Sequence, residues 1–106
     1  RPTMPNTSST RHRPVHPGEI LREEFLVPLE ISMYRLAKDT GMPADRVGRL
    51  VRGTRAFSAD TALRLAAYFK TTAEFWMNLQ ARYDLEVARD SRAARAVSKI
   101  RPYKAA

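Results

Sequence analysis

The residues best suited to chemistry in this chain are acidic and basic side chains spaced along one short segment, PADRVGRLVRG. At about 100° of rotation per residue along a helix, Asp45, Arg49 and Arg52 fall on one face, opposite an apolar stripe. An arginine can donate two hydrogen bonds to guanine, and an aspartate can accept one from the amino group of cytosine. This face therefore predicts the reading of bases in the DNA major groove, with Pro43 and Ala44 at the tip of the helix.

Each of these side chains also has a simpler explanation. Asp45 and Arg49 are four residues apart, so they could form a surface ion pair that stabilises the helix by roughly 0.2–0.5 kcal/mol. We expect Arg49 to contact a base, whereas Asp45 is the weaker candidate because phosphates repel an acid that does not face a suitable base edge. The remaining members of the predicted DNA-binding set are expected near phosphates or on a solvated face: Ser32, Arg46, Arg52 and Arg55.

Two short helices joined by a tight turn must position this face. Ser32 is a good N-cap for the first helix, and Gly41 suits the left-handed backbone that ends it. Pro43 suits the first turn of the second helix, which Gly53 closes. Residues 32–55 therefore predict a helix-turn-helix, the arrangement that places a helix in the DNA major groove.

Three further helices are expected to support this unit. One begins near Pro17 and is limited by Pro28, one is capped by Ser58, and one opens with a capping box of Thr71 and Glu74. Together the five helices predict an all-α domain over residues 16–90. Residues 1–15 have few apolar side chains and predict a flexible arm, while residues 91–106 predict a basic C-terminal extension.

The last helix of the domain has an apolar face wider than one small bundle needs. A large aromatic such as Trp76 is more often a core residue, but a domain of about 70 ordered residues has a thin core and gains from a partner. We expect this face to serve the core and a dimer interface, with five members: Phe75, Trp76, Leu79, Tyr83 and Val87. A two-fold dimer would place two recognition helices about 34 Å apart and would favour a palindromic DNA site.

The composition favours a nucleic-acid partner. The chain has 19 Lys and Arg against 11 Asp and Glu, a net charge of +8, which also leaves an RNA- or ribosome-binding protein open. The lack of cysteine and of long apolar segments suits a soluble, cytoplasmic protein with no membrane span.

His12 and His16 have the spacing of helical metal ligands, but neighbouring prolines oppose a helix there, so we expect no metal and no cofactor. No nucleophile lies beside a base in a known motif, so no enzyme is expected.

A family resemblance extends this interpretation. It lies in three segments, HPGEILREEFLVPLEIS, RLAKDTGMPADRVGRLVRGTRAFSADTALRLAAYF and EFWMNLQARYDLEVAR, which together resemble the HigA-type antitoxins of the lambda-repressor-like helix-turn-helix group. The resemblance implies a five-helix fold, a homodimer that represses its own operon, and neutralisation of a RelE-like, mRNA-cleaving toxin. It also implies that Pro43, Ala44, Asp45 and Arg49 face bases and that Ser32, Arg52 and Arg55 lie near phosphates. Some similar proteins are free-standing regulators, which is the main alternative.

Overall fold

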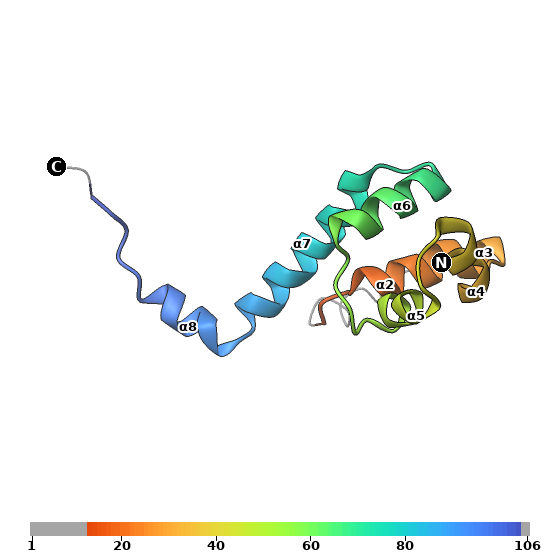
Figure 1. Cartoon of the computed structure of the whole chain (residues 1–106). Helices are drawn as coiled ribbons and strands as arrows, with labels where there is room; N and C mark the ends of the chain where they lie inside the picture. The colour runs from red at the N-terminus through yellow and green to blue at the C-terminus, as the bar shows by residue number, and fades with distance from the viewer. Residues whose placement is uncertain (1–12, 105–106) are drawn as a thin grey trace.

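The computed structural model describes residues 13–104, and this part of the chain is helical without strands, which confirms the all-α, lambda-repressor-like fold. The helices in chain order are α2 (Pro17–Ile20), the π-helix η1 (Leu21–Leu26), α3 (Val27–Leu29), α4 (Met33–Thr40), α5 (Ala44–Arg52), α6 (Ala59–Phe69), α7 (Ala73–Arg89) and α8 (Arg92–Ser98). The first three form one continuous helical stretch, so the five expected helices are present and α8 is a sixth. Figure 1 shows α7 extending out of the compact part and ending beside α8. The expected flexible arm falls mainly on residues 1–12, outside the described residues.

Pro28 shapes the first helical stretch instead of ending it at once. A proline has no N–H to donate to a carbonyl one turn earlier. The backbone widens before it into the π-helix, and the N–H of Val27 bonds the carbonyl of Arg22, five residues back. The stretch ends only at Glu30, which has a left-handed φ of 55°.

The helix-turn-helix forms as the sequence predicted, with one shift. The Ser32 hydroxyl accepts a 3.0 Å hydrogen bond from the N–H of Arg35, and Gly41 turns the chain with a φ of 75°. Pro43 is the N-cap of α5, with extended ψ of 142°, so the prediction that it lies in the first helical turn was wrong by one residue. Gly53 ends α5 with a φ of 79°.

The start of α7 also differs from the sequence prediction by one residue. Ser58 caps α6 as expected, but the cap of α7 is Thr72, whose hydroxyl accepts from the N–H of Phe75 at 3.0 Å. The Thr71 hydroxyl instead accepts a 2.8 Å hydrogen bond from the indole nitrogen of Trp76. The capping box of Thr71 and Glu74 is therefore not formed, because a buried side chain uses the Thr71 oxygen.

Trp76 is at the centre of the core. Its side chain is fully buried, and its ring packs 5.8 Å from that of Phe57 and 5.1 Å from that of Phe25. A residue without exposed surface has none to offer a second protomer, so the expectation that Trp76 belongs to a dimer interface was wrong. The remaining fully buried large side chains come from every helix that surrounds it and include Leu21, Leu36, Val47, Leu50 and Leu65.

Helix α5 is held against the start of α2 by a close backbone approach. A β-carbon at Gly18 would lie only 1.8 Å from the carbonyl oxygen of Leu50. Only glycine leaves room for this contact. The position of α5 therefore depends on a residue 26 or more positions earlier in the chain.

Candidate nucleic-acid interface

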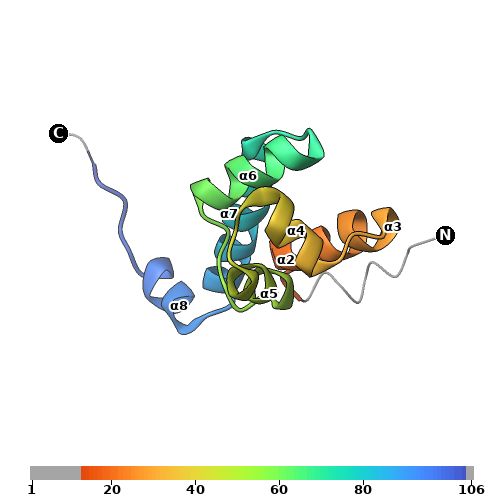
Figure 2. The ribbon, with the colours of Figure 1, turned by 45° about the vertical axis from the view of Figure 1, so that its right-hand side comes forward.

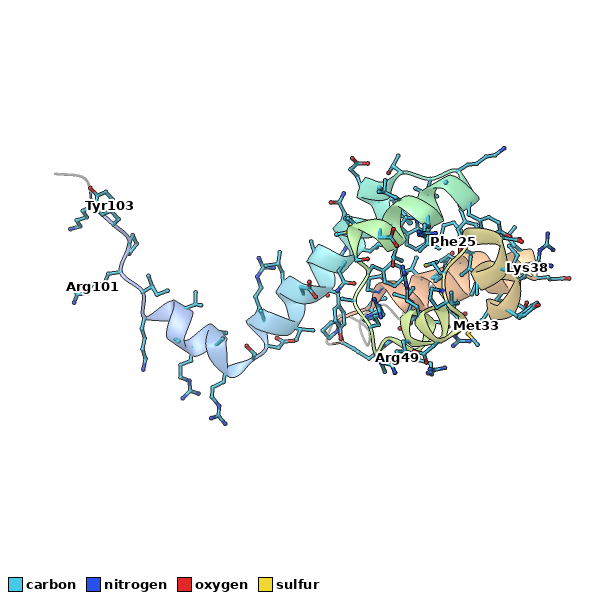
Figure 3. All side chains as sticks on the ribbon, in the orientation of Figure 1. Phe25, Met33, Lys38, Arg49, Arg101 and Tyr103 are labelled. Atoms are coloured by element: carbon cyan, nitrogen blue, oxygen red, sulfur yellow. The ribbon has the colours of Figure 1, made fainter. Side chains whose placement is uncertain are left out.

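Helix α5 has an apolar inner side and a charged outer side. Val47 and Leu50 are fully buried, whereas Asp45, Arg49 and Arg52 are exposed. This arrangement confirms the helical periodicity from which the two faces were predicted. Figure 3 shows Arg49 at the outer edge of the compact part of the molecule.

Arg49 and Asp45 form the surface ion pair that the sequence left open. The Nε of Arg49 lies 3.1 Å from a carboxylate oxygen of Asp45, and their side chains are 56% and 73% exposed. The contact is made through Nε, and within residues 13–104 no hydrogen bond from the two terminal nitrogens of Arg49 is found. Those nitrogens form the paired donor edge that recognises guanine. An ion pair and a base contact are therefore compatible for Arg49, and the second carboxylate oxygen of Asp45 is not used by this contact.

Arg46 lies apart from the other predicted DNA contacts. Its side chain is only 20% exposed, and it donates to Asp60 at 2.8 Å and to Thr61 at 3.4 Å, both on α6. Asp60 also accepts from Arg64 at 3.0 Å, and the hydrogen bonds from Arg46 and then Arg64 lower the pKa of this carboxyl. Arg46 thus joins α5 to α6, and its surroundings favour this structural role over a phosphate contact.

Ser32, Arg52 and Arg55 lie on the surface near the two ends of the helix-turn-helix. The backbone N–H groups at the start of α4, beside the Ser32 cap, are suited to a phosphate because they carry the positive end of the helix dipole. Within residues 13–104, neither Arg52 nor Arg55 takes part in an ion pair. The guanidinium of Arg52 lies over Gly48, where a β-carbon would approach it to 3.0 Å. Both arginines therefore remain candidates for phosphate contacts.

His16 has a structural role that the sequence analysis missed. Its Nδ1 accepts a 2.9 Å hydrogen bond from the N–H of Gly18, which caps α2, and its ring packs 4.8 Å from that of Tyr83. Burial lowers the pKa of His16, against the opposing effects of Asp84 and the Arg55 backbone. The signal in the sequence was a polar side chain directly before Pro17, the position of an N-cap.

His12 and His16 have the spacing of helical metal ligands, although we expected no metal there. His12 lies outside the described residues, and His16 acts as a cap. Between residues 13 and 104 no group of three or more His, Cys, Asp or Glu side chains is arranged to hold a metal ion.

The face predicted for dimerisation on α7 is divided between core and surface. Leu79 is partly buried against the core and Tyr83 packs on His16, whereas Phe75 and Val87 are 37% and 42% exposed. Leu85 is more exposed than either, at 51%, and was not among the predicted members. Over the described residues, the surface that α7 leaves available lies mainly toward its C-terminal end.

No helix in the described part is long and apolar enough to cross a membrane.

Known proteins resemble this chain in both sequence and structure. The model of the helix-turn-helix family matches residues 21–76. Virulence-associated protein I of Dichelobacter nodosus is 49% identical over 74 residues, which cover 70% of this chain and 68% of that protein. The structure of the Pseudomonas aeruginosa antitoxin HigA with the higBA promoter is 47% identical with a TM-score of 0.80, covering 85% of this chain and 98% of that one. The structure of the antitoxin GraA in complex with its operator is 40% identical with a TM-score of 0.81, and the match covers 88% of this chain and 94% of that one.

Proposed function

Because this chain belongs to the helix-turn-helix family, whose members are DNA-binding proteins and not enzymes, we propose that it is a HigA-type antitoxin that binds operator DNA through α5. The observation that supports this most directly is the exposed face of α5, where Arg49 keeps its two terminal nitrogens available. The Pseudomonas aeruginosa antitoxin HigA, whose structure includes promoter DNA, shares 47% of its residues over nearly its whole length. In this proposal Arg49 reads a base, while Arg52, Arg55 and the start of α4 hold phosphates.

We further propose that the protein acts as a cytoplasmic homodimer that represses its own operon. Two copies related by a two-fold axis would present their α5 helices to major grooves about one DNA turn, ~34 Å, apart. The exposed apolar side chains of α7, including Phe75 and Val87, are the surface from which we expect the dimer to form. The operator would then be a palindrome upstream of the gene.

The toxin is the part of the proposal that rests on the family resemblance. HigA-type antitoxins resemble this chain over most of its described length, and such proteins neutralise RelE-like toxins that cleave mRNA. We therefore propose a toxin of this class as the protein partner.

Operator binding is tested with purified full-length protein and a labelled duplex from the region upstream of its gene. A scrambled duplex and an RNA of the same sequence are the controls. With about six phosphate contacts per dimer from the helix-turn-helix alone, affinity for the promoter duplex is expected to fall at least ~10³-fold between 50 and 200 mM salt. Equal affinity for all three nucleic acids would contradict sequence-specific DNA binding.

The toxin is tested separately by co-expressing the neighbouring reading frame with this protein. Growth arrest by the neighbour alone, relieved by this protein with co-purification of the two, is the expected result. If no neighbour arrests growth while operator binding stands, the protein is a free-standing regulator.

A further inference from the structure

The C-terminal extension, residues 91–106, has charge of one sign only. It contains five of the 19 Lys and Arg residues and none of the 11 Asp and Glu residues, so it supplies more than half of the net charge of +8. The five cations are Arg92, Arg95, Lys99, Arg101 and Lys104. In the described part of the chain none of these five forms an ion pair, whereas seven arginines of the preceding elements are each paired with a carboxylate.

Helix α8 separates these cations from its apolar side. With about 100° of rotation per residue, Arg92, Arg95 and Lys99 lie within about 60° of one another on one face. The opposite face, together with the end of α7, borders a groove of about 410 Å³. The α7 and α8 apolar residues that line this groove are Leu85, Ala88, Ala93, Ala94 and Val97. The apolar side of α8 is therefore turned toward α7 and its basic side away from it.

The fold places α8 where a duplex held by α5 can reach it. Helices α5 and α8 lie on the same, lower side of the molecule in both ribbon views, and α7 leads from the compact part to α8 (Figure 1, Figure 2). The longest dimension of the structure is 56 Å. A duplex of 20 base pairs is about 68 Å long at 3.4 Å per step. DNA in contact with α5 is thus long enough to pass α8 as well.

We propose that the C-terminal extension is a second DNA-binding element, in which Arg92, Arg95 and Lys99 contact phosphates beside the site read by α5. This inference rests on the proposed function and adds a backbone contact outside the helix-turn-helix. Phosphates are the expected target because three cations along about 10 Å of helix match the closely spaced charges of a strand. A short helix without buried residues does not fix side chains firmly enough to distinguish bases.

The test compares two variants of the full-length protein on the promoter duplex over a range of salt concentrations. The triple variant R92Q/R95Q/K99Q removes the three charges, and R92K/R95K keeps all of them. Because α8 has no buried residues, both variants are expected to fold with the unfolding midpoint of the wild type. The slope of log affinity against log salt is expected to become shallower by about 2.7 per protomer in the triple variant, at 0.9 per lost contact, and to stay unchanged in the lysine variant.

Three results would overturn the proposal, and they are distinguishable. A wild-type protein that does not bind the promoter duplex would remove the proposed function and this inference together. Specific binding by the wild type with an identical slope for the triple variant would remove this inference alone. A triple variant that binds DNA normally but no longer co-purifies with the toxin would assign the extension to a protein partner. The proposal is supported if the triple variant binds the promoter duplex and the scrambled duplex more weakly than the wild type by the same factor, because phosphate contacts do not depend on sequence.

Discussion

The guanidinium of Arg46 lies 2.8 Å from the carboxylate of Asp60 and joins α5, the proposed recognition helix, to α6. The same carboxylate accepts from Arg64, whose other nitrogen donates to the carbonyl of Thr40 at 2.9 Å. One acidic side chain on α6 therefore connects the end of α4 with the first turn of α5. This carboxylate is therefore one of the links between the two helices of the helix-turn-helix, which also pack directly on each other.

Replacing Arg46 by methionine is expected to lower the urea midpoint of unfolding with an unchanged m value. The substitution keeps the aliphatic stem and removes the link to Asp60. Arg49→Met is the matched control, because that ion pair is exposed and its loss should change the stability by less than about 0.5 kcal/mol. Equal midpoints for the two variants would show that Arg46 does not hold α5 to α6.

The ion pair between Arg46 and Asp60 also predicts how the stability of the protein changes in acid. The pKa of Asp60 is lowered, so its contribution to stability is complete above the ordinary value of 3.8 and is lost as the pH falls through the lower, folded value. Arg46→Met should therefore lose less stability than the wild type when urea unfolding is compared at pH 5 and pH 2.5. A parallel loss in both proteins would contradict this assignment.

His16 predicts a second pH dependence in a different range. Burial lowers its pKa, so the unfolded state binds the proton more readily, and stability falls as the pH drops below the ordinary value of 6.5. We expect urea unfolding of the wild type to show this loss between pH 7 and pH 5. His16→Asn keeps an acceptor at the cap and should show a flatter profile over that range. A profile as steep as that of the wild type would assign the effect to other groups.

Gly18→Ala is expected to destabilise the protein by about 1–3 kcal/mol, because the added methyl group overlaps the carbonyl of Leu50 and the backbone must move. Gly48→Ala is the matched control in α5 itself. There the new β-carbon meets only the mobile end of Arg52, and alanine is favoured over glycine inside a helix by up to about 1 kcal/mol. Thermal unfolding of both variants tests this contrast. Similar losses in the two would mean that the close approach of α2 and α5 is not what makes glycine necessary at position 18.

Much of the fold could be predicted from local sequence signals, and the errors have a common cause. Periodicity located the helices, and Ser32, Gly41 and Gly53 marked their ends correctly. The errors arose where a tertiary partner changes a local preference. Thr71 does not cap α7 because its oxygen accepts from Trp76. For Arg46, which was expected near phosphates, no local signal indicated its bond to a carboxylate 14 residues later. The base and phosphate contacts stay predictions, since a pattern of exposed arginines does not fix which DNA atoms they meet.

The roles of Thr71 and Thr72 can be separated by neighbouring substitutions. Thr71→Val keeps the shape but leaves the Trp76 N–H without its acceptor, which should cost about 1–3 kcal/mol in the free energy of unfolding and alter the tryptophan fluorescence of the folded state. Thr72→Ala removes the cap of α7 and should cost about 1 kcal/mol with the fluorescence unchanged. If Thr72→Ala alters the fluorescence and Thr71→Val does not, the indole is held by the cap and not by its own hydrogen bond.

Substitutions at Arg49 and Arg52 test which residues on the outer face of α5 contact bases and which contact phosphates. Arg49→Ala is expected to relax the preference at one base position by about 1–3 kcal/mol, because a paired donor edge for guanine is lost. Arg52→Ala should weaken binding to promoter and scrambled duplexes alike and reduce the salt slope by about 1. Competition against duplexes mutated one base pair at a time measures both effects. Uniform loss of affinity in Arg49→Ala would move this residue to the phosphates, and α5 would then read sequence through its tip, Pro43 and Ala44, or through DNA shape.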